Sequence, residues 1–137
     1  MINFTSVRFK NFGSFGNYFT NIDFTGNPMT LVSGSNGHGK SYALLDSITF
    51  TLFGRPFRKI NIPQLVNTIN NKDCVTEVNF NIGSDNYMLV RGLKPKKFEI
   101  YKNDELVKQN AKSKDYQKLL EEQILKMNYK SFTHYLL

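Results

Sequence analysis

The stretch that decides the fold is residues 34–41, which read GSNGHGKS. It meets the spacing G-x-x-x-x-G-K-[ST] at Gly34, Gly39, Lys40 and Ser41. The glycines allow positive φ and lack the Cβ that would hold the backbone away from an anion, so successive N–H groups can point at a phosphate. We expect Lys40 to reach the β- and γ-phosphates of ATP and the Ser41 hydroxyl to bind Mg²⁺. The stretch therefore predicts a phosphate-binding loop (P-loop).

The residues on both sides of this loop have the patterns that the motif requires. The apolar run MTLVS, residues 29–33, leads directly into Gly34 and predicts a buried strand. After the loop, residues 40–54 predict a helix that ends at Gly54. Four apolar residues share one face of that helix: Leu44, Leu45, Ile48 and Leu52. The order strand, loop and helix distinguishes a P-loop from an ordinary glycine turn at the start of a helix.

The remaining sequence predicts a sheet around this helix. Alternating segments indicate strands at 2–12 and 18–24, a hairpin at 75–92 that turns at GSDN, and further antiparallel strands at 98–101 and 105–107, with a turn at 26–28. Two more helices are expected near the C-terminus, one capped by Ser113 with Tyr116, Leu119, Leu120 and Ile124 on one face, and one capped by Asn128. The predicted fold class is α/β: a P-loop NTPase whose mixed β-sheet carries antiparallel hairpins around the P-loop helix.

Length and composition predict one domain over residues 1–137 in a reducing cytoplasm. Cys74 is the single cysteine, no signal peptide is apparent, and no run of 18 apolar residues could cross a membrane. The formal net charge of +7 favours a polyanionic partner such as nucleic acid. Basic residues cluster in three places, which are Arg55, Arg58 and Lys59, then Lys94, Lys96 and Lys97, then Lys112 and Lys114. These basic residues are interpreted either as ordinary solvated charges on loops or as a surface that binds the phosphate backbone of DNA.

The chain lacks the residues that would complete an ATPase. A P-loop enzyme needs an acidic residue at the end of an apolar strand to hold Mg²⁺, and no run of four apolar residues followed by Asp or Glu occurs after the loop. The acidic candidates are all expected to be solvated surface residues: Asp46, Asp73, Glu77, Asp85, Glu99 and Asp104. His38 and His134 form neither a metal site nor a triad. We therefore expect no catalytic residue within these 137 residues and no ATP hydrolysis by this chain alone.

Several motifs resemble those of the SMC-like repair ATPases, the family of bacterial SbcC and its eukaryotic Rad-fifty relatives. They are a strand ending in KNF at 10–12, the P-loop about twenty residues later, and LLDSI at 44–48. A second set resembles the ATPase subunits of the recombination endonucleases of T-even-type bacteriophages. It comprises FGRPFR at 53–58, QLVN at 64–67, RGLKPKKFEIY at 91–101, SKDYQ at 113–117 and NYKSF at 128–132. The resemblance covers essentially the whole chain.

The resemblance implies the N-terminal lobe of an ABC/SMC-type ATPase head. In that family a long coiled coil separates this lobe from a C-terminal lobe that carries the catalytic carboxylates. The family assigns six residues to ATP and Mg²⁺: Gly34, Asn36, Gly37, Gly39, Lys40 and Ser41. It implies as partners the C-terminal lobe, a second head, an SbcD-type nuclease subunit and double-stranded DNA, in the cytoplasm of an infected bacterium. The sequence departs from the family at Gly13, where relatives often carry Arg, and at Tyr42, where Ser or Thr is usual.

Two interpretations of the chain remain open. In the first it is a fragment of an enzyme subunit, as its apolar ending HYLL suggests. In the second it is a naturally short, non-catalytic half-head that engages a nuclease, a cognate ATPase or DNA, for example as a decoy. A coiled coil and a signature motif in the adjoining reading frame would support the first reading, and an isolated gene with a stop codon would support the second.

Overall fold

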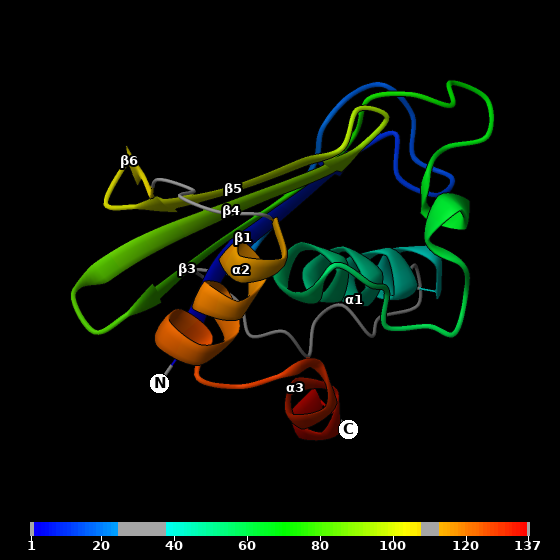
Figure 1. Cartoon of the computed structure of the whole chain (residues 1–137). Helices are drawn as coiled ribbons and strands as arrows, with labels where there is room; N and C mark the ends of the chain where they lie inside the picture. Colours follow the sequence, from blue (N-terminus) through cyan, green and yellow to red (C-terminus); the bar gives the residue numbers. More distant parts are fainter. Residues whose placement is uncertain (1, 25–37, 108–112, 137) are drawn as a thin grey trace.

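The structure, a computed structural model, describes residues 2–24, 38–107 and 113–136. Its strands are β1 Ile2–Lys10, β2 Thr20–Asp23, β3 Cys74–Ile82, β4 Asp85–Leu93, β5 Lys97–Lys102 and β6 Glu105–Leu106. Its helices are α1 His38–Phe53, the 3₁₀ helix η2 Ile62–Leu65, α2 Ser113–Leu119, the π-helix η3 Leu120–Leu125 and α3 Tyr129–Leu136. The strands form one sheet, and α1, α2 and α3 all lie on the same side of it (Figure 1).

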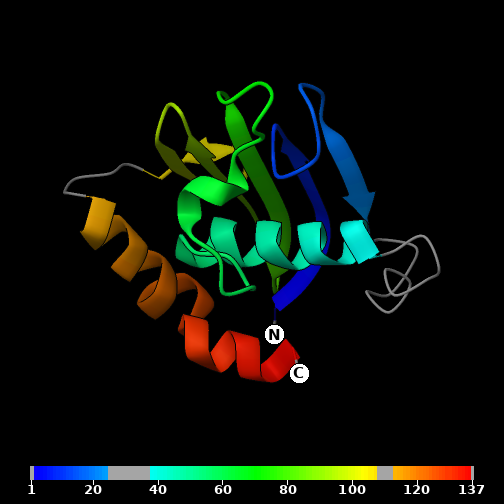
Figure 2. The same cartoon turned by 90° about the vertical axis from the view of Figure 1, so that its right-hand side faces the viewer.

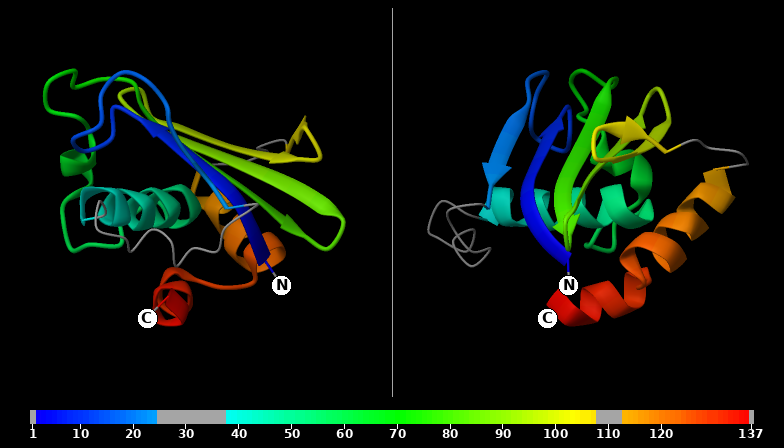
Figure 3. Two further views of the ribbon diagram at one scale, coloured as in Figure 1. Left: turned by 180° about the vertical axis from the view of Figure 1, so that it is seen from behind. Right: turned by 90° about the vertical axis from the view of Figure 1, so that its left-hand side faces the viewer.

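The sheet has the strand order β2-β1-β3-β4-β5-β6, and each pairing between the described strands is antiparallel. The expected hairpin at 75–92 is confirmed, because β3 and β4 pair from Cys74↔Leu93 to Ile82↔Asp85 around Gly83. The predicted strands at 98–101 and 105–107 correspond to β5 and β6. The predicted strand at 29–33 and the turn at 26–28 lie outside the described residues. The right-hand panel of Figure 3 looks onto the face of the sheet that the helices leave open, with α1 behind the strands.

Helix α1 crosses the inner face of the sheet (Figure 2). Its residues Leu44, Ile48 and Leu52 are almost completely buried and belong to a core that also contains Val78, Leu89 and Ile100 of the sheet. Leu45, which was predicted to share this face, is only half-buried. Burial of three large aliphatic side chains holds the helix firmly against β3 and β4, at roughly 1.5–3 kcal/mol for each side chain. The direction of α1 is thereby fixed by its own sequence pattern.

The C-terminal end of α1 follows the prediction. Gly54 has φ +81° and its N–H donates to the carbonyl of Phe50 at 2.8 Å, which closes the last turn. A left-handed residue at this place is ordinary for glycine and strained for other residues. The helix therefore ends where the sequence places its stop signal.

The C-terminal helices differ in one respect from the prediction. The helix that begins at Ser113 keeps α geometry only to Leu119 and then continues as the π-helix η3, after which Lys126 adopts φ 56°. Of the residues predicted to share one face, Tyr116 and Leu120 are buried, whereas Leu119 and Ile124 are half-buried. The wider π-turn rotates the later residues away from the α-helical face. The predicted cap of α3 is confirmed, since the Ser131 N–H donates to Asn128 Oδ1 at 2.9 Å.

Cys74 makes one testable contribution to stability. It is fully buried beside Phe9, Phe12 and Leu65, and burial raises the pKa of its thiol from 9.0 to about 12. Between these two values the unfolded thiol ionises while the folded thiol keeps its proton, so the free energy of unfolding should fall as the pH rises. We expect a loss of about 1.4 kcal/mol per pH unit at most. Urea unfolding of the wild type at pH 8 and pH 10 measures it.

Tyrosines and lysines also titrate in this range, so Cys74→Ala is the reference. The wild type should lose more stability between pH 8 and pH 10 than this variant does. Equal losses in the two proteins would show that the thiol contributes nothing to the pH dependence.

Candidate nucleotide-binding site

The C-terminal part of the predicted P-loop coincides with the start of α1. Gly39, Lys40 and Ser41 fall in the first turns of this 16-residue helix, whereas Gly34, Asn36 and Gly37 lie outside the described residues. A helix start offers unpaired N–H groups and the positive end of the helix dipole, both of which favour a bound anion. The described part of the site thus agrees with a P-loop, and the role of each loop residue stays a prediction.

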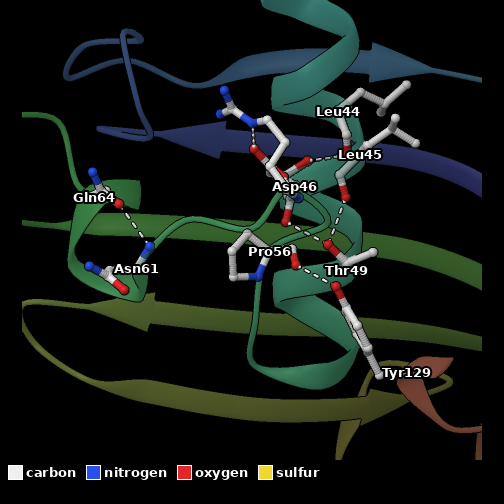
Figure 4. Close-up of polar contacts among 10 residues, drawn as sticks. Leu44, Leu45, Asp46, Thr49, Pro56, Asn61, Gln64 and Tyr129 are labelled. Atoms are coloured by element: carbon white, nitrogen blue, oxygen red, sulfur yellow. Dashed lines mark hydrogen bonds and ion pairs between the residues drawn. The ribbon is translucent and has the colours of Figure 1, made fainter. Parts of the chain in front are cut away.

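Asp46 lies about two turns into α1, and its environment differs from the prediction. It was predicted to be solvated, but its side chain is completely buried. Oδ1 accepts the backbone N–H of Arg58 at 2.9 Å, and Oδ2 accepts Nε of the same residue at 2.7 Å. Figure 4 shows Asp46 on the side of α1 that faces the segment after the helix. The guanidinium compensates the desolvation of the carboxylate, so burial is possible.

Glu77 on β3 corrects the same prediction in the same way. Only 8% of its side chain is exposed, and Arg8 on the neighbouring strand β1 approaches its Oε2 to 2.7 Å with both Nε and Nη2. The remaining acidic candidates Asp73, Asp85 and Glu99 are half-buried, and Asp104 is exposed. Within the described residues, no group of three His, Cys, Asp or Glu side chains could hold a metal ion. The acidic residues of the described part of the chain therefore form no metal site.

The predicted basic clusters lie on exposed segments that meet near the C-terminal end of α1. Lys96 and Lys97 line the same cavity as Gly54, the residue before Arg55. Arg55, Lys59, Lys94, Lys96 and Lys97 are exposed, and Arg58 keeps 43% of its side chain accessible while it bonds to Asp46. The Arg55 guanidinium carbon lies 3.7 Å from the centre of the Tyr129 ring. The cluster of Lys112 and Lys114 falls on residues whose side chains the structure does not describe.

Two buried asparagines that the sequence analysis did not single out fix the loop after β1. The Asn67 amide donates to the carbonyls of Gly13 at 3.0 Å and Phe15 at 3.2 Å. Asn11 is fully buried and its amide donates to Asn17 Oδ1 at 2.9 Å. Both asparagines belong to the motifs KNF and QLVN, so the resemblance held the only signal that could have found them.

The departure at Gly13 now has a structural context. Gly13 has φ +58°, and a Cβ added there would meet nothing within 4 Å. The position has room for a longer side chain, and the left-handed backbone is what favours glycine. The sequence difference is therefore compatible with an unchanged loop.

The Asp46 contact leads to a stability prediction. Asp46→Ala removes both acceptors for Arg58, including the one that holds a backbone N–H, and we expect the free energy of unfolding to fall by about 1–3 kcal/mol. Asp46→Asn is the matched control, because its amide oxygen can still accept the Arg58 N–H, and it should lose less. Denaturant unfolding of the three proteins measures both effects. Wild-type stability in Asp46→Ala would contradict the role given to this contact.

A sheet backed on one side by the helix of a P-loop motif defines the class of P-loop NTPases. A family model described as "AAA domain" matches residues 6–136, and the chain belongs to this family. Two similar proteins are named "Exonuclease subunit 2". The one from Enterobacteria phage T4 is 40% identical over 126 residues, and the one from Escherichia phage RB69 is 37% identical over 126 residues. Each alignment covers 92% of this chain but only 22% of the relative, so the chain spans about a fifth of the length of these relatives.

Solved structures agree with the family. One described as "Structural biochemistry of ATP-driven dimerization and DNA stimulated activation of SMC ATPases" matches with a TM-score of 0.61 and 25% identity, covering 86% of this chain and 77% of that one. The Smc head domain of Pyrococcus furiosus matches with a TM-score of 0.58 and 23% identity, covering 88% of this chain and 33% of that one. The second likeness shows the fold alone. Together these findings confirm the resemblance to SMC-like recombination ATPases and the predicted P-loop α/β fold.

Proposed function

We propose that residues 34–41 bind the phosphates of Mg-ATP and that the chain is the N-terminal lobe of an SMC-type ATPase head. The observation that carries the proposal is the P-loop motif placed directly before a long helix whose position the core fixes. The donor set suits the ligand, because the backbone N–H groups and the Lys40 ammonium complement phosphate charge and the Ser41 hydroxyl is a hard ligand for Mg²⁺. Bound Mg²⁺ would neutralise charge on the β- and γ-phosphates.

Within the whole protein we propose a role in an ATP-dependent nuclease. The relatives are named as exonuclease subunits, which supports a nuclease subunit of the SbcD type as partner and the ends of double-stranded DNA as substrate. One similar solved structure is described in terms of ATP-driven dimerization of SMC ATPases, which supports a second head as a further partner. Hydrolysis would then require the catalytic carboxylates that the family resemblance places in the C-terminal lobe.

For DNA we propose the two exposed basic clusters near the C-terminal end of α1. They comprise Arg55, Arg58, Lys59, Lys94, Lys96 and Lys97. Such cations would contact the phosphate backbone without reading sequence. A DNA-binding assay at several salt concentrations tests this, because removing one phosphate contact should make the salt dependence of the affinity less steep.

The nucleotide proposal is tested by calorimetric titration of Mg-ATP into the 137-residue chain, with a parallel assay for released phosphate. We expect one molecule of ATP to bind per chain and no phosphate to be released. ATP with excess EDTA should bind more weakly, because the Ser41 hydroxyl then has no metal to hold. A folded chain that does not bind Mg-ATP would overturn the proposal for this lobe by itself, and rapid phosphate release would overturn the assignment of hydrolysis to the missing carboxylates.

A further inference from the structure

A second concave site lies at the end of α1 that is opposite to the P-loop. It is a cavity of about 410 Å³ between the C-terminal end of α1, the strands β4 and β5, and α2. Its apolar walls include the rings of Phe50, Phe53 and Phe98. A helix of 16 residues is about 24 Å long, so this cavity and the predicted P-loop lie far apart, at opposite ends of α1. The volume falls within the range of small-molecule sites, roughly 300–1,000 Å³.

One cation lies inside this cavity. The guanidinium of Arg91 stands over the Phe98 ring, with its central carbon 3.7 Å from the ring centre. Nε donates to the carbonyl of Thr51 at 3.1 Å, and Nη2 donates to Oε1 of Gln117. Within the described part of the chain, Nη1 makes no hydrogen bond, and a Cβ added at Gly54 would meet it at 3.3 Å. Burial lowers the pKa of Arg91 to about 9, so the group stays cationic at neutral pH.

Two further cations stand at the cavity rim. Lys96 comes from the turn between β4 and β5, Lys97 is the first residue of β5, and both are exposed. The Lys97 ammonium is 3.7 Å from the Glu99 carboxylate. The Glu121 carboxylate accepts a hydrogen bond from the Gln117 amide at 2.7 Å and also attracts the Arg91 guanidinium electrostatically. The lining itself contains three cations and no acidic residue. An anion that entered the cavity would therefore be attracted by all three.

A structural role for Arg91 accounts for only part of this arrangement. Its bond to Thr51, together with the Gln117 bond to the Leu52 carbonyl at 2.9 Å, satisfies carbonyls at the C-terminal end of α1. That role uses Nε and, through Gln117, Nη2. It requires neither Nη1, nor the two lysines, nor the empty space between the phenylalanine rings.

We propose that this cavity binds a small amphipathic anion, with its phosphate or carboxylate near Arg91 and the two lysines and its apolar or aromatic body between Phe50, Phe53 and Phe98. Both parts of such a ligand find a complement, since arginine and lysine bind either anion and phenylalanine rings accept a flat apolar group. The site is independent of the proposed ATP site, because it uses other residues at the other end of α1.

Phenyl phosphate is the probe that tests the proposal. It is titrated into the ¹⁵N-labelled chain while amide shifts are followed, and the shifts should concentrate at Gly54, Gly92 and Phe98. Inorganic phosphate and phenol, which each carry half of the probe, should bind at least about tenfold more weakly. Benzoate in place of phenyl phosphate distinguishes a carboxylate ligand from a phosphate ligand.

Variants at the exposed rim avoid unfolding the protein. The double variant Lys96→Gln, Lys97→Gln should lower the affinity for phenyl phosphate by about fivefold to tenfold. Lys94→Gln removes one charge from the same turn at a residue that does not line the cavity, and it should leave the affinity within about twofold. Absence of binding, equal loss in the two variants, or shifts confined to the start of α1 would each overturn the proposal. The proposal would also be overturned if a short DNA duplex shifted these amides while neither phenyl phosphate nor benzoate did. The lysines would then serve only the DNA surface proposed above.

Discussion

Lys40→Ala is expected to lower the affinity of the chain for Mg-ATP by a hundredfold or more. The ammonium would lose charge-assisted hydrogen bonds to two phosphates, each worth about 1.5–3 kcal/mol. A loss of about 3 kcal/mol corresponds to roughly a hundredfold in the dissociation constant. The thermal stability of the protein without nucleotide should hardly change, because the change lies in the first turn of α1 and not among the apolar residues that fix the helix. Calorimetric titration of both proteins measures the difference.

The matched control for this prediction is Lys59→Ala, which removes the same charge from an exposed residue of the segment after α1. It should leave the affinity for Mg-ATP within about twofold. In the whole protein with its nuclease partner, Lys40→Ala should also remove ATP-dependent nuclease activity. Unchanged ATP binding by Lys40→Ala would contradict the assignment of the P-loop, and retained ATP-dependent nuclease activity would contradict the proposed function.

Phe80→Ala is expected to lower the free energy of unfolding by about 3–5 kcal/mol. Phe80 is the seventh of the nine residues of β3 and is 1% exposed. Its ring stacks on Tyr87 at a centroid distance of 5.3 Å and meets the edge of Phe4 at 5.9 Å. The truncated side chain would leave a cavity between three strands and would also lose both ring contacts. A shift of the denaturant midpoint with an unchanged slope measures the loss.

Ile69→Ala serves as the control for burial. Ile69 is 88% exposed, so its truncation should change stability by less than about 0.5 kcal/mol. If the two variants lost similar stability, the packing around Phe80 would not be what holds the sheet together.

Local patterns explain why most of the fold could be predicted. The hairpin of β3 and β4 alternates along its length, and Gly54 and Asn128 are strong end signals for helices. These signals act within a few residues of each other in the sequence. The π-helix after Leu119 has no such local signal, because six residues are too few for an apolar pattern to distinguish its period from that of an α-helix.

The buried charges could not be predicted because their partners are distant. Asp46 is buried by Arg58, which a loop brings back along α1, and Glu77 is buried by Arg8, 69 residues away in the sequence. From sequence alone a single carboxylate is expected on the surface, and only the fold supplies its counter-charge. The same holds for Arg91, because the cavity that it lines is formed by elements far apart in the sequence. The P-loop differs from these buried charges, because its motif is contained within residues 34–41 and could be recognised without knowledge of distant partners.

The strand order also implies an order of folding. From β3 to β6 each strand pairs with its sequence neighbour across a short turn, whereas β1 pairs with β3 between residues as far apart as Ile2 and Ile82. Closing a loop of about 70 residues costs roughly 2.5 kcal/mol more entropy than closing one of about four. We therefore expect residues 74–106 to form a meander early, and β1 to add to the edge of β3 as a later, slower step. The pairing of β1 with β3, although it lies inside the finished sheet, would then form only after the meander is in place.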